Sequence, residues 1–234
     1  IPRYLDNVEP EYIKTLLTYL FDHHKTMITG VSMRELTPYG ETNRAFNSLA
    51  LFDKAGMQYY HKRHLVPFGE YIPRPFRWIV DAFLPMSDFT SGHALDNNPL
   101  TLTAQGLQLA PTICYEDAFG EEILANARQS HVLINVSNLA WFGQHLALEQ
   151  HFQISKLRAL ETQRPLLSST NTGVTGAIDD RGYVIARLPN NVQNILEVQI
   201  QGREGETPYM RYGNWPVLVW CSLIVCLAFL APKR

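Results

Sequence analysis

Residues 113–117 read ICYED, and residues 62–73 read KRHLVPFGEYIP. Cys114 follows a short apolar run, so we expect it at the end of a strand, with its sulfur exposed. The next backbone N–H groups would then be free to bind an oxyanion. Lys62 and Glu70 bracket an apolar turn that contains a proline and a glycine. A lysine held there can stabilise negative charge on a carbonyl oxygen, and a carboxylate can orient the lysine or transfer protons.

The cysteine motif and the charged turn each also have a simpler interpretation. A lone cysteine is more often a small buried apolar residue than a nucleophile. A catalytic cysteine needs a nearby base or cation, because the free thiol has a pKa of about 8.5. A charged run such as residues 61–64 is, in isolation, more often a solvated surface patch. The position of Cys114 alone therefore does not decide between a catalytic and a structural role.

The sequence lacks the motifs of several other site types. The eight histidines show no spacing typical of metal ligands, so we expect no metal site. There is no phosphate-binding loop, G-x-S-x-G motif or dinucleotide fingerprint. Cys221 and Cys226 lie in an apolar tail, and three cysteines in 234 residues do not form a disulfide framework. Cys114 is the only cysteine in the rest of the chain.

Composition indicates a folded protein that does not bind nucleic acid. Hydrophobic residues make up 46% of the chain, which is enough for a core and excludes a disordered polypeptide. Lys+Arg number 20 against 22 Asp+Glu, so no basic excess is available to neutralise nucleic-acid phosphates. Charged residues are only 18%, below the roughly 25% usual in soluble domains, which indicates contact with lipid.

Alternating helical and strand-like segments predict an α/β body with a mixed sheet. Helices are expected at residues 9–23 and 144–163. Strands are expected at residues 27–33, 44–52, 57–62, 112–114, 132–136, 166–169, 174–178, 183–187 and 195–200. Turns at residues 53–56 and 179–182 would join neighbouring strands into hairpins.

The C-terminal tail predicts a transmembrane helix over residues 212–232, after a catalytic domain at residues 1–210. Residues 212–232 carry no charge, and about 20 apolar residues span a hydrocarbon core of roughly 30 Å. A buried core helix is the alternative. Lys233 and Arg234 follow, and their charge favours a cytoplasmic C-terminus, which would place the body outside the cytoplasm. Residues 74–92 mix aromatic residues with few charges, and fit a loop over the core and a membrane-facing lid equally well.

The ordered motifs KRHLVPFGEYIP, ICYED and NVSNLAWFG (residues 135–143) resemble the nitrilase (carbon–nitrogen hydrolase) superfamily, and within it the apolipoprotein N-acyltransferase family. The resemblance runs through most of the chain. It implies an α/β fold, a nitrilase-like α-β-β-α sandwich with mixed sheets followed by a transmembrane helix. It also implies that no cofactor is needed.

The resemblance assigns roles to individual residues. The nucleophile is Cys114 and the catalytic lysine is Lys62, with Glu70 as a supporting carboxylate. The backbone N–H of Tyr115 would share the oxyanion with the lysine, and Glu116 is the acidic residue after the nucleophile.

The same resemblance makes Trp141 and Phe142 the aromatic pair near an acyl-chain entrance. Leu139 stands where the family pattern has an acidic residue. The general base of the family is a glutamate in a W-P-E motif, whose end resembles Ile1 and Pro2, so we expect the base upstream of residue 1.

These roles imply transfer of a fatty acyl chain from a phospholipid, through a thioester on Cys114, to the N-terminal α-amino group of a diacylglyceryl-cysteine apolipoprotein. The implied partners are the phospholipid, the apolipoprotein and the bilayer. The implied place is the bacterial inner (cytoplasmic) membrane, with the catalytic domain on the periplasmic side. Two alternatives remain open: an amidase acting on a small amide, and a truncated, non-catalytic membrane-anchored chain that lacks its base.

Overall fold

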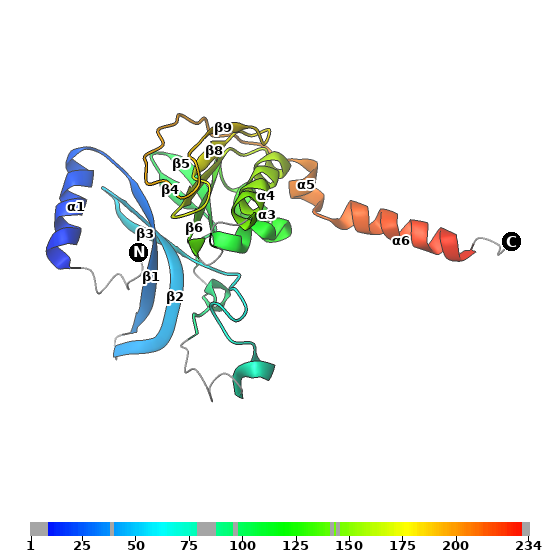
Figure 1. The fold of residues 1–234 in the computed structure, drawn as a ribbon, viewed down its shortest axis with the longest axis horizontal. Helices are drawn as coiled ribbons and strands as arrows, with labels where there is room; N and C mark the ends of the chain where they lie inside the picture. Colours follow the sequence, from blue (N-terminus) through cyan, green and yellow to red (C-terminus); the bar gives the residue numbers. More distant parts are fainter. Residues whose placement is uncertain are drawn as a thin grey trace.

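The computed structural model describes residues 9–37, 40–78, 88–95, 98–140, 143 and 146–230. Two β-sheets lie face to face, and helices cover the outer face of each sheet. In Figure 1 the helix α1, the strands β1–β3, the second sheet and the helices α3 and α4 follow one another from left to right.

The first sheet is antiparallel and has the order β1 (Met27–Thr37), β2 (Gly40–Asp53), β3 (Gly56–His61). The helix α1 (Pro10–Asp22) packs on its outer face. Pro10 occupies the first turn, where its missing N–H costs nothing, and leucines recur on one helical face. That face meets Val31, Ala50 and Phe52 of the sheet. The predicted helix and hairpin of this region are confirmed.

The second sheet is mixed and is built from six strands. Their order is β4 (Leu102–Ala104), β5 (Leu107–Ile113), β6 (Val132–Ser137), β7 (Leu166–Thr170), β8 (Gly176–Ile178) and β9 (Val184–Arg187). β5, β6 and β7 run parallel, and the flanking pairs are antiparallel. The helices α3 (Gly120–Arg128) and α4 (Ala147–Thr162) bury apolar residues against the outer face of this sheet. The sequence predicted α4 but not α3.

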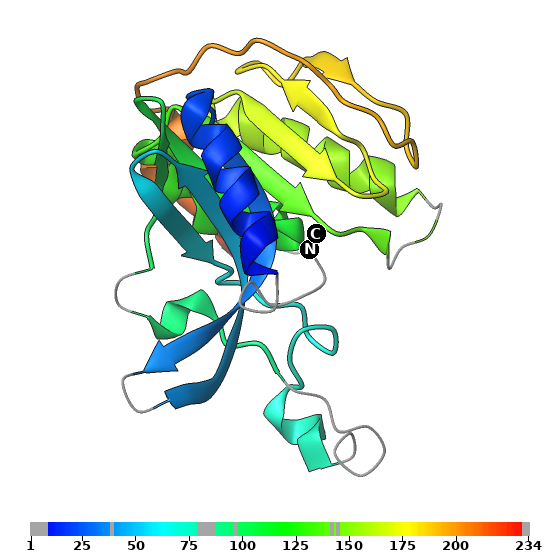
Figure 2. The ribbon, with the colours of Figure 1, turned by 90° about the vertical axis from the view of Figure 1, so that its left-hand side faces the viewer.

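The alternation of side chains along the strands explains the layers. In β2, Leu49 and Leu51 face the second sheet, whereas Ala50 and Phe52 face α1. Leu49 and Leu51 share the inter-sheet core with Tyr60 of β3 and with apolar residues of β4, β5 and β6. The result is the predicted α-β-β-α arrangement, seen from a second side in Figure 2.

The segment at residues 195–200 corrects one prediction, because it forms no strand. It alternates apolar and polar residues as an edge strand does, but the described part of the chain offers it no ladder of backbone hydrogen bonds. Ile195 is 82% exposed, while Ile200 packs partly against the inter-sheet core. Alternation alone therefore did not establish a strand here.

The tail differs from its prediction in where its helix begins. α5 (Pro208–Tyr212) ends at Gly213, whose φ of 56° breaks the helix, so α6 begins only at Trp215 and runs to Leu230. Its 16 described residues rise about 24 Å along the helix axis, and residues 231–234 lie outside the described residues. Within the described ranges, no helix is both long and apolar enough to cross a membrane. The predicted transmembrane helix at 212–232 is therefore not supported.

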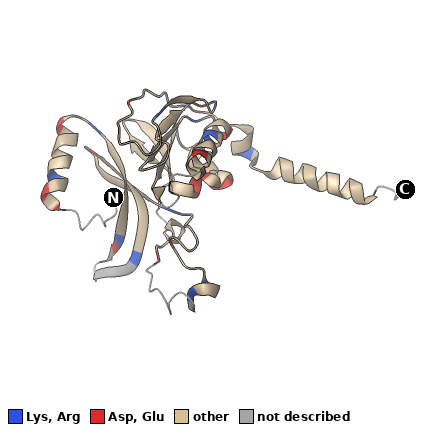
Figure 3. Cartoon of the chain, in the orientation of Figure 1, with Lys and Arg blue, Asp and Glu red and all other residues tan. Residues whose placement is uncertain are grey.

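α6 nevertheless has an unusual surface. Figure 1 shows it projecting from the body, and Figure 3 shows no charged residue along it. None of its residues is buried, and its large apolar side chains are between 50% and 85% exposed.

The segment at residues 74–92 is described in part. Residues 79–87 lie outside the described residues, so the lid prediction is not decided. Before this gap are the short helix η2 (Arg74–Phe76) and Trp78, which is 75% exposed, and after it is η3 (Gly92–Ala94).

Candidate active site

Lys62 directly follows β3, and the strand register directs it between the sheets. Tyr60 faces the inter-sheet core, so Lys62, two residues later, points to the same side. The Lys62 N–H donates to the carbonyl of Asn47 at 2.8 Å. The Lys62 side chain is 1% exposed, and its Nζ donates to both oxygens of Glu70, at 3.0 and 2.8 Å. A buried ammonium is stable only with such a counter-charge.

Glu70 is held by the turn that precedes it. Its Oε1 also accepts a hydrogen bond from Asn47 Nδ2 at 2.6 Å, and its Oε2 accepts one from the Val66 N–H at 2.8 Å. The turn closes through the Glu70 N–H, which donates to the Val66 carbonyl at 2.8 Å. Each carboxylate oxygen therefore accepts two hydrogen bonds, so Glu70 is placed to fix the Lys62 ammonium.

Cys114 lies at the junction between β5 and the short helix η4 (Cys114–Ala118). Its φ is 56°, a left-handed conformation that costs a non-glycine residue about 1–3 kcal/mol and is common at functional sites. Asn135 Nδ2 holds this elbow by donating to the Cys114 carbonyl at 2.9 Å and to Thr112 Oγ1 at 3.0 Å. The thiol is free and partly exposed, as expected for a nucleophile at a strand end.

The electrostatics of the thiol show two opposing effects. Burial raises the pKa of Cys114, while the Lys62 charge and a hydrogen bond from the Tyr115 backbone N–H lower it. Lys62 Nζ lies 5.9 Å from the centroid of the Tyr115 ring. The structure thus brings together four of the predicted residues: Cys114, Lys62, Glu70 and Tyr115.

Glu116 joins the elbow to the segment that carries Lys62. Its Oε2 accepts from the Ile113 N–H at 2.7 Å, and its Oε1 accepts from the backbone N–H groups of Arg63 and His64 at 2.7 and 3.1 Å. The Tyr60 hydroxyl donates to the same Oε1 at 3.1 Å. Burial raises the pKa of Glu116, and these backbone donors oppose that shift. Glu116 therefore fixes the position of the Cys114 elbow relative to the segment that carries Lys62.

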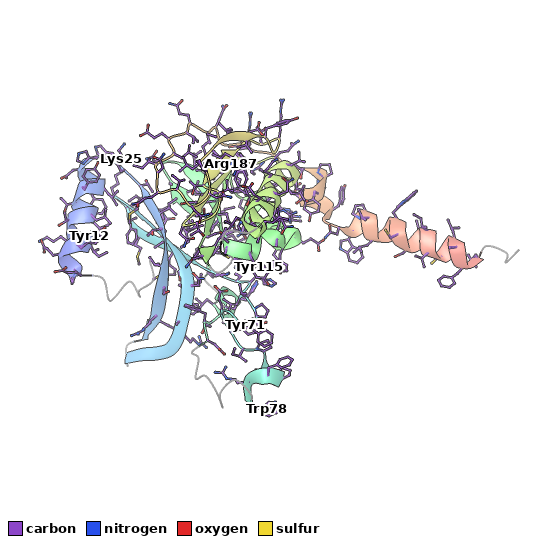
Figure 4. All side chains as sticks on the ribbon, in the orientation of Figure 1. Tyr12, Lys25, Tyr71, Trp78, Tyr115 and Arg187 are labelled. Atoms are coloured by element: carbon purple, nitrogen blue, oxygen red, sulfur yellow. The ribbon has the colours of Figure 1, made fainter. Side chains whose placement is uncertain are left out.

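A cavity of about 490 Å³ opens beside the segment that follows Lys62, and Cys114 is not among the described residues that line it. His64 lines it, stacks on Phe119 with ring centroids 3.6 Å apart, and meets the Tyr115 ring edge-on at 5.4 Å. Tyr71 also lines the cavity, and Figure 4 shows Tyr71 below Tyr115 on the same side of the domain.

Sequence reasoning missed several supporting residues. Asn47 gave no signal, because its role depends on the pairing of β2 with β3. Asn135 opens the NVSNLAWFG motif, which could have pointed to it. Asp117 is fully buried and accepts a hydrogen bond from Ser155 Oγ of α4 at 2.5 Å, which anchors η4 from behind. The predicted substrate-binding residues Trp141 and Phe142 lie outside the described residues. In the part of the chain that is described, no three His, Cys, Asp or Glu side chains are placed to hold a metal ion.

The family described as Carbon-nitrogen hydrolase matches residues 5–209. The chain belongs to the carbon-nitrogen hydrolase family. Among curated relatives, the apolipoprotein N-acyltransferase of Nitrosomonas europaea is 42% identical over 98% of this chain and 46% of its own length. That of Ralstonia nicotianae is 42% identical over 100% of this chain and 44% of its own length. The chain thus spans somewhat less than half of the curated relatives it matches.

Solved structures share the fold of this chain. A carbon-nitrogen hydrolase from Helicobacter pylori superposes with a TM-score of 0.56 at 15% identity, over 79% of this chain and 65% of that chain. The NitFhit protein of C. elegans gives 0.55 at 18% identity, over 78% and 44%. At such identities the likeness concerns the fold alone, and it agrees with the nitrilase-like α/β architecture predicted from the sequence.

Proposed function

We propose that this chain carries the catalytic site of an apolipoprotein N-acyltransferase, with Cys114 as the nucleophile. The observation that carries the proposal is the strained Cys114 elbow beside the buried Lys62–Glu70 pair. The names of the curated relatives support the acyl-transfer reaction.

In the first half-reaction the Cys114 thiolate attacks an ester carbonyl of a phospholipid. The Lys62 ammonium and the Tyr115 N–H stabilise the tetrahedral oxyanion, and Glu70 holds the ammonium in place. The S–C bond forms and the ester C–O bond breaks. The thiol proton passes through a base to the leaving oxygen, so that a lysophospholipid departs. We assign the base to a glutamate upstream of residue 1, as the family resemblance implies.

In the second half-reaction the α-amino group of a diacylglyceryl-cysteine apolipoprotein attacks the thioester. The same oxyanion donors stabilise the second tetrahedral intermediate, the amide C–N bond forms, and the C–S bond breaks. The base takes a proton from the amine and returns it to the Cys114 sulfur. Because burial raises the pKa of Cys114, a thiol is the favoured product of this step at neutral pH.

The proposed place of this reaction is the periplasmic face of the bacterial inner membrane. Both substrates carry acyl chains, so the site must meet lipid. The exposed apolar side chains of α6 support attachment to lipid, because such a surface is costly in water. Phe76 and Trp78 are exposed in and directly after η2, and they offer a second apolar surface for contact with lipid.

Mass spectrometry of the intact protein incubated with a phospholipid of defined acyl chains tests the proposal. We expect one acyl group, released by neutral hydroxylamine, on the wild type and none on Cys114→Ala. Cys221→Ala and Cys226→Ala are matched controls that should still be acylated. An adduct that survives in Cys114→Ala would refute the assignment, and turnover of small amides without acylation by phospholipid would favour an amidase.

A further inference from the structure

The 490 Å³ cavity beside the segment that follows Lys62 carries chemistry that the acyl-transfer steps do not use. Its volume lies within the range of small-molecule sites, roughly 300–1,000 Å³. One part of its wall is apolar, formed by Leu65, Ile72 and Phe89, and the rest is rich in charge. A cavity of this mixed kind fits a ligand that has an apolar stem and an ionic group.

The charge of the wall is predominantly positive. Arg63, Arg74 and Arg77 line it, against a single carboxylate, Asp88. Arg77 is paired with Asp88, which also accepts a hydrogen bond from the Ile72 N–H. Arg63 is engaged as well, because its Nη2 donates to the Asn98 carbonyl at 2.9 Å and its guanidinium lies over Tyr60.

Arg74 differs from these two arginines. Within the described ranges its side chain makes no ion pair or hydrogen bond, and it is exposed on the cavity wall in η2. The described acidic groups close to this wall are engaged elsewhere: Glu122 is paired with His64 Nδ1 at 3.0 Å, Glu70 is paired with Lys62, and Glu116 accepts from backbone N–H groups. Arg74 therefore presents a free guanidinium, whose donors match the oxygens of a phosphate in a bidentate manner.

Cys114 is not among the described residues that line the cavity, but the cavity borders the residue that follows it. His64 lines it and contacts the ring of Tyr115, the residue after Cys114. A ligand anchored at Arg74 could thus extend a neighbouring group toward the sulfur. In a phospholipid the phosphodiester and the acyl esters are attached to one glycerol, so an anchored phosphate restricts where the ester carbonyl can lie.

We propose that this cavity binds the phosphodiester of the lipid acyl donor, with Arg74 as its principal ligand and Arg77 as a second cation. The proposal rests on the proposed function, since it assigns the head-group end of that donor. A neutral glyceride with the same acyl chains would lack this anchor.

Binding measurements on the intact protein carrying Cys114→Ala test the proposal without turnover. The two ligands are dihexanoyl phosphatidylmethanol and dihexanoylglycerol, which share acyl chains and differ in the methyl phosphodiester. We expect the phospholipid to bind about tenfold more tightly, the size of one lost charge-assisted hydrogen bond. Adding Arg74→Gln should abolish that difference. The matched control Arg181→Gln, an exposed arginine in the turn between β8 and β9, should preserve it.

Two results would overturn the proposal: equal affinity for the two ligands, or a difference that survives Arg74→Gln. Inorganic phosphate provides a third comparison. If it displaces the phospholipid with similar affinity, the cavity is a site for free anions and the lipid assignment is wrong.

The acyl-transfer proposal and the phosphodiester proposal can fail independently of each other. If wild-type protein forms no acyl-Cys114 although binding depends on Arg74, the acyl-transfer proposal fails and the phosphodiester site stands. If acyl-Cys114 forms normally and binding does not depend on Arg74, the phosphodiester proposal alone fails.

Discussion

Replacing Glu70 by glutamine tests the buried Lys62–Glu70 pair. The substitution preserves shape but removes the negative charge that faces the Lys62 ammonium at 2.8 Å. Either orientation of the new amide also turns its NH2 group toward two donors. These would be Lys62 Nζ and Asn47 Nδ2 in one orientation, and Lys62 Nζ and the Val66 N–H in the other.

The expected cost follows from distance and burial. Two unit charges 2.8 Å apart attract by about 6 kcal/mol at an effective dielectric constant of 20. Part of this attraction offsets the desolvation of the two groups. Removing one partner of a buried pair costs about 3–5 kcal/mol, and since Glu70 is 13% exposed we expect about 3 kcal/mol.

Urea unfolding of the intact protein measures this cost. The matched control is Glu149→Gln, because Arg187 Nη2 lies 2.7 Å from Glu149 Oε1 while the two side chains are 39% and 44% exposed. Solvent screens that pair, so we expect the control to lose less than about 1 kcal/mol. Equal losses for the two variants would contradict the importance given to burial. A stable Glu70→Gln protein that forms acyl-enzyme at the wild-type rate would refute the role given to Glu70.

Three further predictions concern groups around the nucleophile. Glu116→Gln should lower the free energy of unfolding by at least about 2 kcal/mol, because an amide NH2 would face buried N–H donors. Urea unfolding measures this loss, and a loss within experimental error would contradict the prediction. Burial raises the pKa of Cys114 and Lys62 lowers it, so alkylation should accelerate only toward alkaline pH, and Lys62→Met should move the profile to higher pH. The rates are measured in protein with both tail cysteines changed to serine, and a shift to lower pH would refute the reasoning. Burial lowers the pKa of His61 to about 4, below the roughly 6.5 of the unfolded chain, so stability should fall as the pH decreases between these values. His61→Phe should flatten that dependence in thermal unfolding, and an unchanged slope would exclude His61 as its source.

The sequence was sufficient for elements whose pattern is local. The helix before β1 shows an apolar face, and the hairpin of β2 and β3 has a turn between two apolar runs, so both could be located from periodicity. The strand expected at residues 195–200 was wrong, because pairing depends on a partner that the segment itself does not specify. The start of α6 was placed three residues too early, because the break at Gly213 is a backbone conformation and not a change in hydropathy.

In the site as well, residues within local motifs could be predicted, and residues placed by distant segments could not. Cys114, Lys62 and Glu70 lie within motifs and could be predicted, and the structure brings them to one place. Asn47 could not be predicted, because it reaches Glu70 through the register of two strands. The network of Glu116 was also hidden, since its donors come from residues more than 50 positions away as well as from its neighbour Ile113.

A chase experiment tests most directly whether Cys114 transfers the acyl chain. Intact protein is acylated with a phospholipid that carries an isotope-labelled chain, freed of donor, and mixed with a diacylglyceryl-cysteine peptide that has a free α-amino group. We expect the label to leave Cys114 and to appear as an amide on the peptide at the same rate, with an N-acetylated peptide unchanged. Label that appears only as free fatty acid, or that stays on Cys114 when the peptide is added, would contradict the proposed transfer.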